Sequence, residues 1–160
     1  MQRAEPVPER LSHLVLRRQV AVDSAQVARA VRSAGAWLGP EVDGAPDGMH
    51  RHETDLRLRV GEQMALVTFR KAAYVDIGPV EPLDDGYHVE IGWRAATFAP
   101  LFPVFSGSLA IQDDQVTLSG WYAPPGGALG RLADRGLLHV AARATARWLL
   151  GELERAATRP

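Results

Sequence analysis

The 160-residue sequence contains no cysteine, which excludes a disulfide scaffold, a thiolate metal site and a cysteine nucleophile. No apolar run approaches the roughly 18 residues that a membrane-spanning helix needs. The first ten residues carry two prolines and charges of both signs, where a secretory signal would need an apolar stretch. These absences predict a cytoplasmic protein without a membrane span.

An excess of charge of one sign is also missing. The chain has 18 basic and 19 acidic residues, a formal net charge of -1, and no long block of one sign. Proteins that bind DNA or RNA usually carry a broad basic surface. We therefore expect no nucleic-acid partner.

Motifs for common cofactors are absent too. There is no Gly-x-x-x-x-Gly-Lys-Ser/Thr run, no dinucleotide fingerprint and no Gly-x-Ser-x-Gly turn, so we expect no cofactor and no serine-hydrolase site. What is present is a globular composition, with 46% hydrophobic and 23% charged residues. The length fits a single domain over residues 1–160, in which residues 1–11 form a flexible lead-in.

The chain opens with the pattern of a strand followed by a helix. Apolar residues alternate between His13 and Val22, as in a half-buried strand. Asp23 and Ser24 can accept hydrogen bonds from the free amides of a helix start, and apolar residues then follow at helical spacing as far as Leu38. The glycines and prolines that come next predict a mobile loop over residues 39–50.

The middle of the chain has the period of two expected in an antiparallel meander. The pattern predicts strands over residues 55–60, 64–71, 74–80, 87–94, 105–111 and 116–122. The last two should face each other across the short turn Asp113-Asp114.

A long helix is predicted for the carboxy-terminal segment, from Ala128 to about Ala157. Its main apolar stripe would consist of Leu129, Ala133, Leu137, Val140, Ala141, Ala144 and Trp148. Leu138, Leu149 and Leu153 form a second strip. This strip either forms a homodimer contact or packs against the loop before the last strand pair.

This order of elements resembles the helix-grip fold of the START/Bet v 1-like superfamily, which includes polyketide cyclases, dehydrases and lipid transport proteins. Three segments look like a bacterial branch of it: Leu101-Phe102-Pro103-Val104-Phe105, Leu118-Ser119-Gly120-Trp121-Tyr122, and the run from Pro124 to Arg135. The resemblance implies an α+β fold in which a curved antiparallel sheet of about seven strands wraps a long C-terminal helix. It also implies an apolar cavity between the sheet and the helix.

The predicted ligand contacts are mostly aromatic and small side chains. Aromatic rings on several elements either stack on a flat or lipid-like ligand or simply fill the core. Small residues such as Gly107 and Gly120 either leave a void or allow close approach of the backbone. We assign ligand binding to Arg18, Trp37, Phe69, Trp93, Phe105, Leu118, Tyr122, Leu137, Ala141 and Trp148.

Arg18 lies on the same strand face as apolar residues, and an unpaired cation taken out of water is costly. Its partner would be a ligand carboxylate or Glu90, unless the strand bends or the side chain reaches solvent.

The candidate acid/base residues are Tyr74, His88, Glu90 and Tyr122. His88 and Glu90 qualify only if their strand face looks into the cavity. His50 and His52, with Glu53 and Asp55 nearby, have side chains of the kind that bind zinc, but their spacing does not predict a metal site. His139 is interpreted as structural.

Three functional hypotheses follow. The first is binding or transport of a small hydrophobic molecule, such as a lipid, a polyketide or an aromatic metabolite, between the sheet and the C-terminal helix. The alternative is a polyketide cyclase/dehydratase-like enzyme with an acid/base residue in the same cavity. A further alternative is a protein-interaction domain without a ligand.

Overall fold

The computed structural model describes residues 11–60, 67–97, 102–123 and 135–160. Its elements in chain order are β1 (Ser12–Gln19), α1 (Ser24–Arg32), the 3-10 helix η1 (Ala34–Ala36), β2 (Glu41–Val42), β3 (His50–Val60), β4 (Val67–Ile77), β5 (Glu81–Leu83), β6 (Gly86–Ala95), β7 (Val104–Gln112), β8 (Gln115–Ala123) and α2 (Arg135–Thr158).

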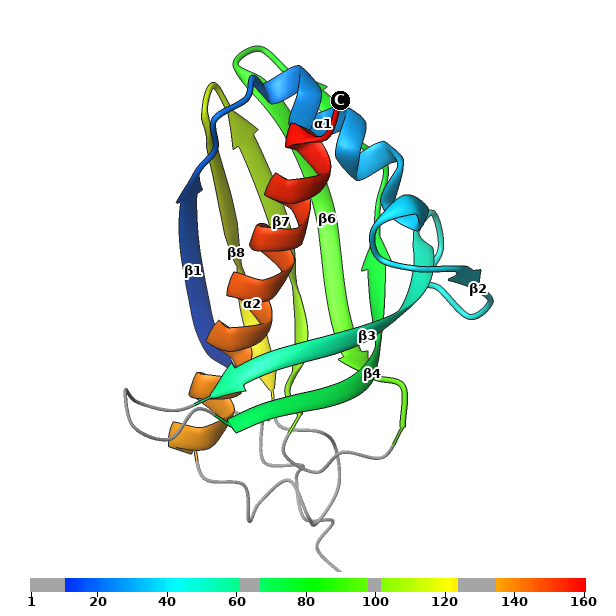
Figure 1. The fold of residues 1–160 in the computed structure, drawn as a ribbon, viewed down its shortest axis with the longest axis vertical. Coiled ribbons are helices and arrows are strands. Elements are labelled where there is room, and N and C mark those ends of the chain that lie inside the picture. Colours follow the sequence, from blue (N-terminus) through cyan, green and yellow to red (C-terminus); the bar gives the residue numbers. More distant parts are fainter. Residues whose placement is uncertain (1–10, 61–66, 98–101, 124–134) are drawn as a thin grey trace, which may run out of the picture.

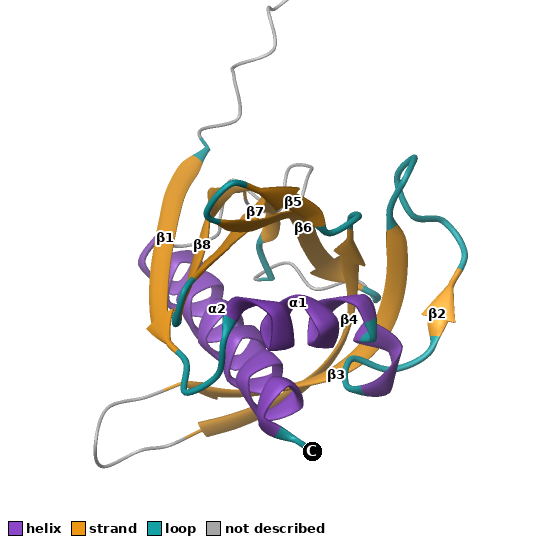
Figure 2. Ribbon diagram, turned by 90° about the horizontal axis from the view of Figure 1, so that it is seen from above, coloured by secondary structure: helices purple, strands orange, loops and turns teal. Residues whose placement is uncertain are grey.

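The strands form one antiparallel sheet in the order β1-β8-β7-β6-β4-β3-β2, and β5 pairs with β6. Seen from above, the sheet curls around α1 and α2, so that both helices lie on its concave side (Figure 2). Buried residues alternate along the central strands, and one set, such as Val89 and Ile91 of β6, is buried on that concave side. The core therefore lies inside the curve of the sheet.

The predicted meander is correct for its last two strands and needs one correction before them. Phe105 pairs with Tyr122 and Gly107 with Gly120, as the alternation predicted. The two strands expected at 64–71 and 74–80 are instead parts of the single strand β4. This strand is continuous because it pairs with β3 at every residue from Val67 to Ile77.

The segment predicted as an irregular loop also contains a short strand. β2 lies within it and pairs with the start of β3, where Glu41 faces His52. Gly39 brings the chain against β3 with a φ of 125°, and a Cβ atom there would collide with the carbonyl oxygen of Glu53. Only glycine fits both the backbone conformation and the close approach.

Replacing Gly39 by alanine is expected to lower the free energy of unfolding by about 1–3 kcal/mol, because strain and a backbone collision add. Urea denaturation would measure this loss. Gly48→Ala is the matched control, since Gly48 also has a positive φ of 78° but no atom within 4 Å of the added Cβ. Equal losses for the two variants would contradict the role of close packing at Gly39.

The start of α1 follows the predicted cap. The Asp23 carboxylate accepts a hydrogen bond from the Gln26 amide at 2.8 Å, and the Gln26 side chain accepts one from the Asp23 amide at 3.3 Å. This reciprocal pair satisfies two amides that a helix start leaves free. α1 ends at Arg32, earlier than the helical pattern to Leu38 predicted, and η1 follows it.

The buried face of α2 differs from the predicted stripe. The residues that face the core are Leu138, Ala142, Ala146, Leu149, Leu150, Leu153 and Ala157. Val140 of the predicted stripe is 44% exposed, whereas Leu138, Leu149 and Leu153 are buried. The strip proposed as a dimer contact is thus part of the core. This alanine-rich helix has apolar residues on two sides. The helical period therefore did not show which of the two sides faces the core.

α2 lies on the concave side of the sheet between β1 and β3 (Figure 1 and Figure 2). Its main neighbours are α1, β3 and β1, and an ion pair joins Arg18 of β1 to Glu154 of α2 with Nε and Oε2 2.5 Å apart. In the described part of the chain, neither helix combines the length and apolar character needed to cross a membrane.

Candidate functional site

Three aromatic residues form a row across the concave face of the central strands. Trp93 of β6 pairs with Phe105 of β7, which pairs with Tyr122 of β8. Directly opposite residues in an antiparallel sheet point to the same face, so the three side chains lie side by side. All three are buried, and the rings of Trp93 and Phe105 stack with centroids 4.0 Å apart and planes 12° apart. We call Trp93, Phe105 and Tyr122 the aromatic row.

The ring of Phe105 covers the paired glycines of β7 and β8. A Cβ atom added to Gly107 would lie 2.8 Å from Phe105 Cζ, and one added to Gly120 would lie 2.7 Å from it. Both distances are shorter than van der Waals contact. Of the two readings left open for these glycines, the structure therefore favours close approach, and the space above them is filled by a ring.

The indole nitrogen of Trp93 is the polar atom that stands out in this row. Trp93 is 1% exposed, and its Nε1 is buried without a hydrogen-bond partner in the described part of the chain. A buried donor left unpaired costs on the order of 1–3 kcal/mol. Its N–H group is therefore available to an acceptor that enters the interior.

Tyr122 at the other end of the row meets a histidine from α2. The Tyr122 hydroxyl and His139 Nδ1 are 2.8 Å apart, and the phenol donates this hydrogen bond when Nδ1 carries no proton. Tyr122 is buried whereas His139 is exposed, so the imidazole links the buried phenol to solvent. The sequence analysis selected Tyr122 but not its partner. The sequence shows only that His139 follows the apolar Leu138 in the predicted helix. Which strand the histidine contacts is decided by the packing of α2.

Neither a protein-family model nor a curated protein matches the sequence. Solved structures do match it. The ZhuI aromatase/cyclase from Streptomyces sp. R1128 superposes with a TM-score of 0.53 and 12% identity over 92% of each chain. The protein TTHA0849 from Thermus thermophilus superposes with a TM-score of 0.51 and 14% identity, over 91% of this chain and 97% of that one. The chain therefore has the helix-grip fold.

Three of the four predicted acid/base residues lie outside the helix-grip interior. Tyr74, His88 and Glu90 alternate with buried residues of β4 and β6, so they lie on the convex face. The Tyr74 ring centroid is 5.0 Å from the Arg51 guanidinium carbon, and His88 Nδ1 is 3.7 Å from Glu81 Oε2. They do not converge with Tyr122.

The remaining predicted ligand contacts are spread over the helix-grip fold. Arg18 pairs with Glu154, not with Glu90. Trp37 donates to the Ala30 carbonyl at 2.8 Å, and Leu118 is fully buried. Trp148 packs against the edge of the core, while Ala141 lies off the buried face of α2. Phe69 lies on β4 and Leu137 on α2, but their side chains lie outside the described residues.

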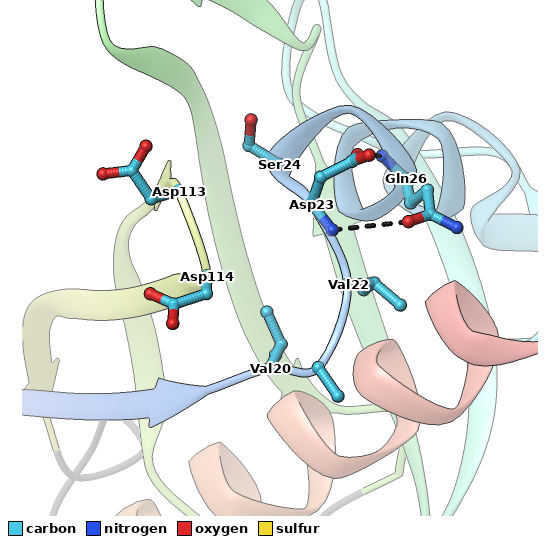
Figure 3. Close-up of a pocket in the computed structure, with 8 residues that line it drawn as sticks. Val20, Val22, Asp23, Ser24, Gln26, Asp113 and Asp114 are labelled. Atoms are coloured by element: carbon cyan, nitrogen blue, oxygen red, sulfur yellow. Dashed lines mark hydrogen bonds between the residues drawn. The ribbon is translucent and has the colours of Figure 1, made fainter.

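A wide surface hollow of about 570 Å³ lies where β1 leads into α1, well away from the aromatic row. Figure 3 shows Asp113 and Asp114 of the β7–β8 turn on one side and Asp23, Ser24 and Gln26 on the other. The Asp23 carboxylate is occupied by the Gln26 amide. Across the described residues, no group of three histidine or acidic side chains is arranged to hold a metal ion.

Proposed function

We propose that the protein binds a small hydrophobic molecule, such as a lipid, a polyketide or an aromatic metabolite, between the sheet and α2. The observation that carries this proposal is the aromatic row with its unpaired indole N–H. Aromatic side chains give a flat ligand a large apolar contact, and one fixed polar group sets its orientation. The ligand class that fits best is an aromatic molecule with a carbonyl oxygen, because such an oxygen accepts from Trp93 Nε1.

The position of α2 supports this reading. α2 packs mainly against β1, β3 and α1, whereas Trp93 and Phe105 belong to the central strands β6 and β7. The helix therefore packs against the end strands of the sheet more than against the central strands that carry Trp93 and Phe105. The fold match to an aromatase/cyclase is consistent with a ligand in this region.

The proposal can be tested with tetralone and tetralin, two bicyclic molecules that differ by one carbonyl group. We expect tetralone to bind more tightly. Trp93→Phe keeps the stacking but removes the N–H group, so it should weaken tetralone binding by about fivefold to tenfold and leave tetralin unchanged. Calorimetric titration would measure both affinities, and native mass spectrometry of protein from its own host would identify a natural ligand.

Trp121→Phe is the matched control for this experiment. Trp121 lies on the convex face of β8, 51% exposed, beside His13. This variant should bind both molecules like the parent protein. Failure of either molecule to bind, together with a crystal structure in which side chains fill the interior, would overturn the proposal.

A second candidate function is acid/base catalysis on the bound molecule, as in a polyketide cyclase or dehydratase. The observation that favours it is the hydrogen bond between Tyr122 and His139, since a phenol linked to an exposed imidazole can exchange a proton with solvent. The assay is the loss of one water from a poly-β-ketoacyl thioester, followed by mass spectrometry. Tyr122→Phe should lower its rate by roughly a hundredfold or more, with tetralone binding retained.

The outcomes separate the hypotheses. Binding without turnover supports the carrier, and turnover that depends on Tyr122 and His139 supports the enzyme. If neither occurs, a protein-interaction domain without a ligand remains as the alternative.

A further inference from the structure

A second hollow lies toward the β3–β2 end of the sheet, whereas Tyr122 lies on β8 near the β1 end. This cleft of about 340 Å³ is formed by the end of α1, η1, β2, the start of β3 and the chain that follows β4. Its apolar walls include Val31, Ala34 and Ile77, all of them buried. The volume lies near the small end of the roughly 300–1,000 Å³ that ligand pockets span. We call this space the α1–β3 cleft.

His52 gives the α1–β3 cleft a buried polar group. His52 is 5% exposed, and its Nδ1 lies 3.1 Å from the carbonyl oxygen of Gly39. Because a carbonyl oxygen only accepts, Nδ1 carries the proton and donates. Nε2 then holds the lone pair of the neutral ring, and no described residue forms a hydrogen bond with it. The carbonyl oxygen of Gly39 thus fixes the tautomer of a histidine that lines a cavity.

Two charged residues line the cleft, Glu41 and Arg32, and of these Arg32 can bind an anion. Glu41 is the one acidic residue that lines it, and His50 already binds this carboxylate, with Nδ1 and Oε1 2.7 Å apart. That hydrogen bond is the main reason that the pKa of Glu41 lies below its ordinary value. Arg32 also lines the cleft. In the described part of the chain its guanidinium forms no salt bridge and lies 5.6 Å from the centre of the Tyr87 ring.

We propose that the α1–β3 cleft binds a small monocarboxylic acid with an apolar body. The apolar part would pack against Val31, Ala34 and Ile77. Binding of the carboxylate would be coupled to uptake of one proton from solvent by His52 Nε2, which then donates to one carboxylate oxygen, and Arg32 would donate a charge-assisted hydrogen bond to the other. This site is separate from the aromatic row and does not depend on the function proposed for it.

Benzoate and benzyl alcohol are suitable probes, because they share a ring and differ in the carboxylate. Titration followed by NMR would report the ring signals of His52 and the indole N–H signal of Trp93. We expect benzoate to shift the His52 signals and leave Trp93 unchanged, and benzyl alcohol to bind at least about tenfold more weakly.

Two variants test the site without disturbing the buried histidine. Arg32→Gln should weaken benzoate binding by about tenfold, the effect of losing one charge-assisted hydrogen bond. Arg29→Gln is its control, since Arg29 is also exposed on α1 but does not line the cleft. Gly35→Ala places a methyl group 3.7 Å from His52 Cε1, an ordinary contact, and should weaken binding by narrowing the cleft.

The proposal is overturned if benzoate leaves the His52 signals unchanged, or if benzyl alcohol binds as tightly as benzoate. It is also overturned if benzoate shifts Trp93 alone, which would place the ligand at the aromatic row. If the Arg32→Gln and Arg29→Gln variants bind benzoate with equal affinity, Arg32 does not contact the carboxylate, and the proposed ligand class is contradicted.

Discussion

Replacement of Asp76 by alanine is expected to lower the free energy of unfolding by about 3–5 kcal/mol. Asp76 of β4 lies directly opposite Arg51 of β3, and the two form hydrogen bonds of 2.7 Å and 2.9 Å through both carboxylate oxygens. The side chains are only 5% and 11% exposed. Their hydrogen bonds are the main reason that the pKa of Arg51 is raised. The variant therefore leaves a buried positive charge that cannot be neutralised.

Urea denaturation would measure the loss. Glu152→Ala is the control, because Glu152 pairs with Arg155 on the outer side of α2, where an ion pair contributes no more than about 1 kcal/mol. Similar losses in the two variants would contradict the importance of burial. The pair at Arg51 matters for function as well, because β3 and β4 also carry His52 and Ile77, which line the α1–β3 cleft.

Phe105→Ala should lower the free energy of unfolding by about 3–5 kcal/mol, since a large buried ring is removed from a packed core. The Phe105 ring stacks on Trp93 and covers Gly107 and Gly120. Neither glycine has a side chain to fill the space that the ring leaves. An apolar cavity should remain, and benzene should raise the melting temperature of the variant more than that of the parent protein.

Trp121→Ala is the control for this prediction. It removes an aromatic ring from the neighbouring strand β8, but from the exposed face, and should change stability much less. A small loss for Phe105→Ala, without any effect of benzene, would mean that neighbouring side chains collapse into the space. The core around Trp93 would then rearrange to fill the space that Phe105 leaves.

Both predictions concern pairs that face each other across neighbouring strands. Arg51 and Asp76 lie on the convex face and Trp93 and Phe105 on the concave face. The convex pair holds β3 to β4, and the concave pair forms the wall of the proposed ligand site. A substitution in the convex pair therefore lowers stability without removing a side chain of the aromatic row.

The sequence by itself determined the elements whose signals are local. Alternating apolar residues predicted β6, β7 and β8 and the pairing of Phe105 with Tyr122, and Asp23 marked the start of α1. These features depend on the strand period and on hydrogen bonds within one helical turn, which neighbouring residues specify. The resemblance to the helix-grip fold added the wrapping of the sheet around the last helix.

Only the tertiary structure decided which groups meet. It buried Leu149 and Leu153 of α2, joined Tyr122 to His139, and placed the Gly39 carbonyl against His52. The apolar pattern of α2 suits two orientations, and the rotation of the helix depends on what β1, β3 and α1 leave open. Contacts between residues far apart in the chain are fixed by packing, and the local period of apolar residues cannot predict them.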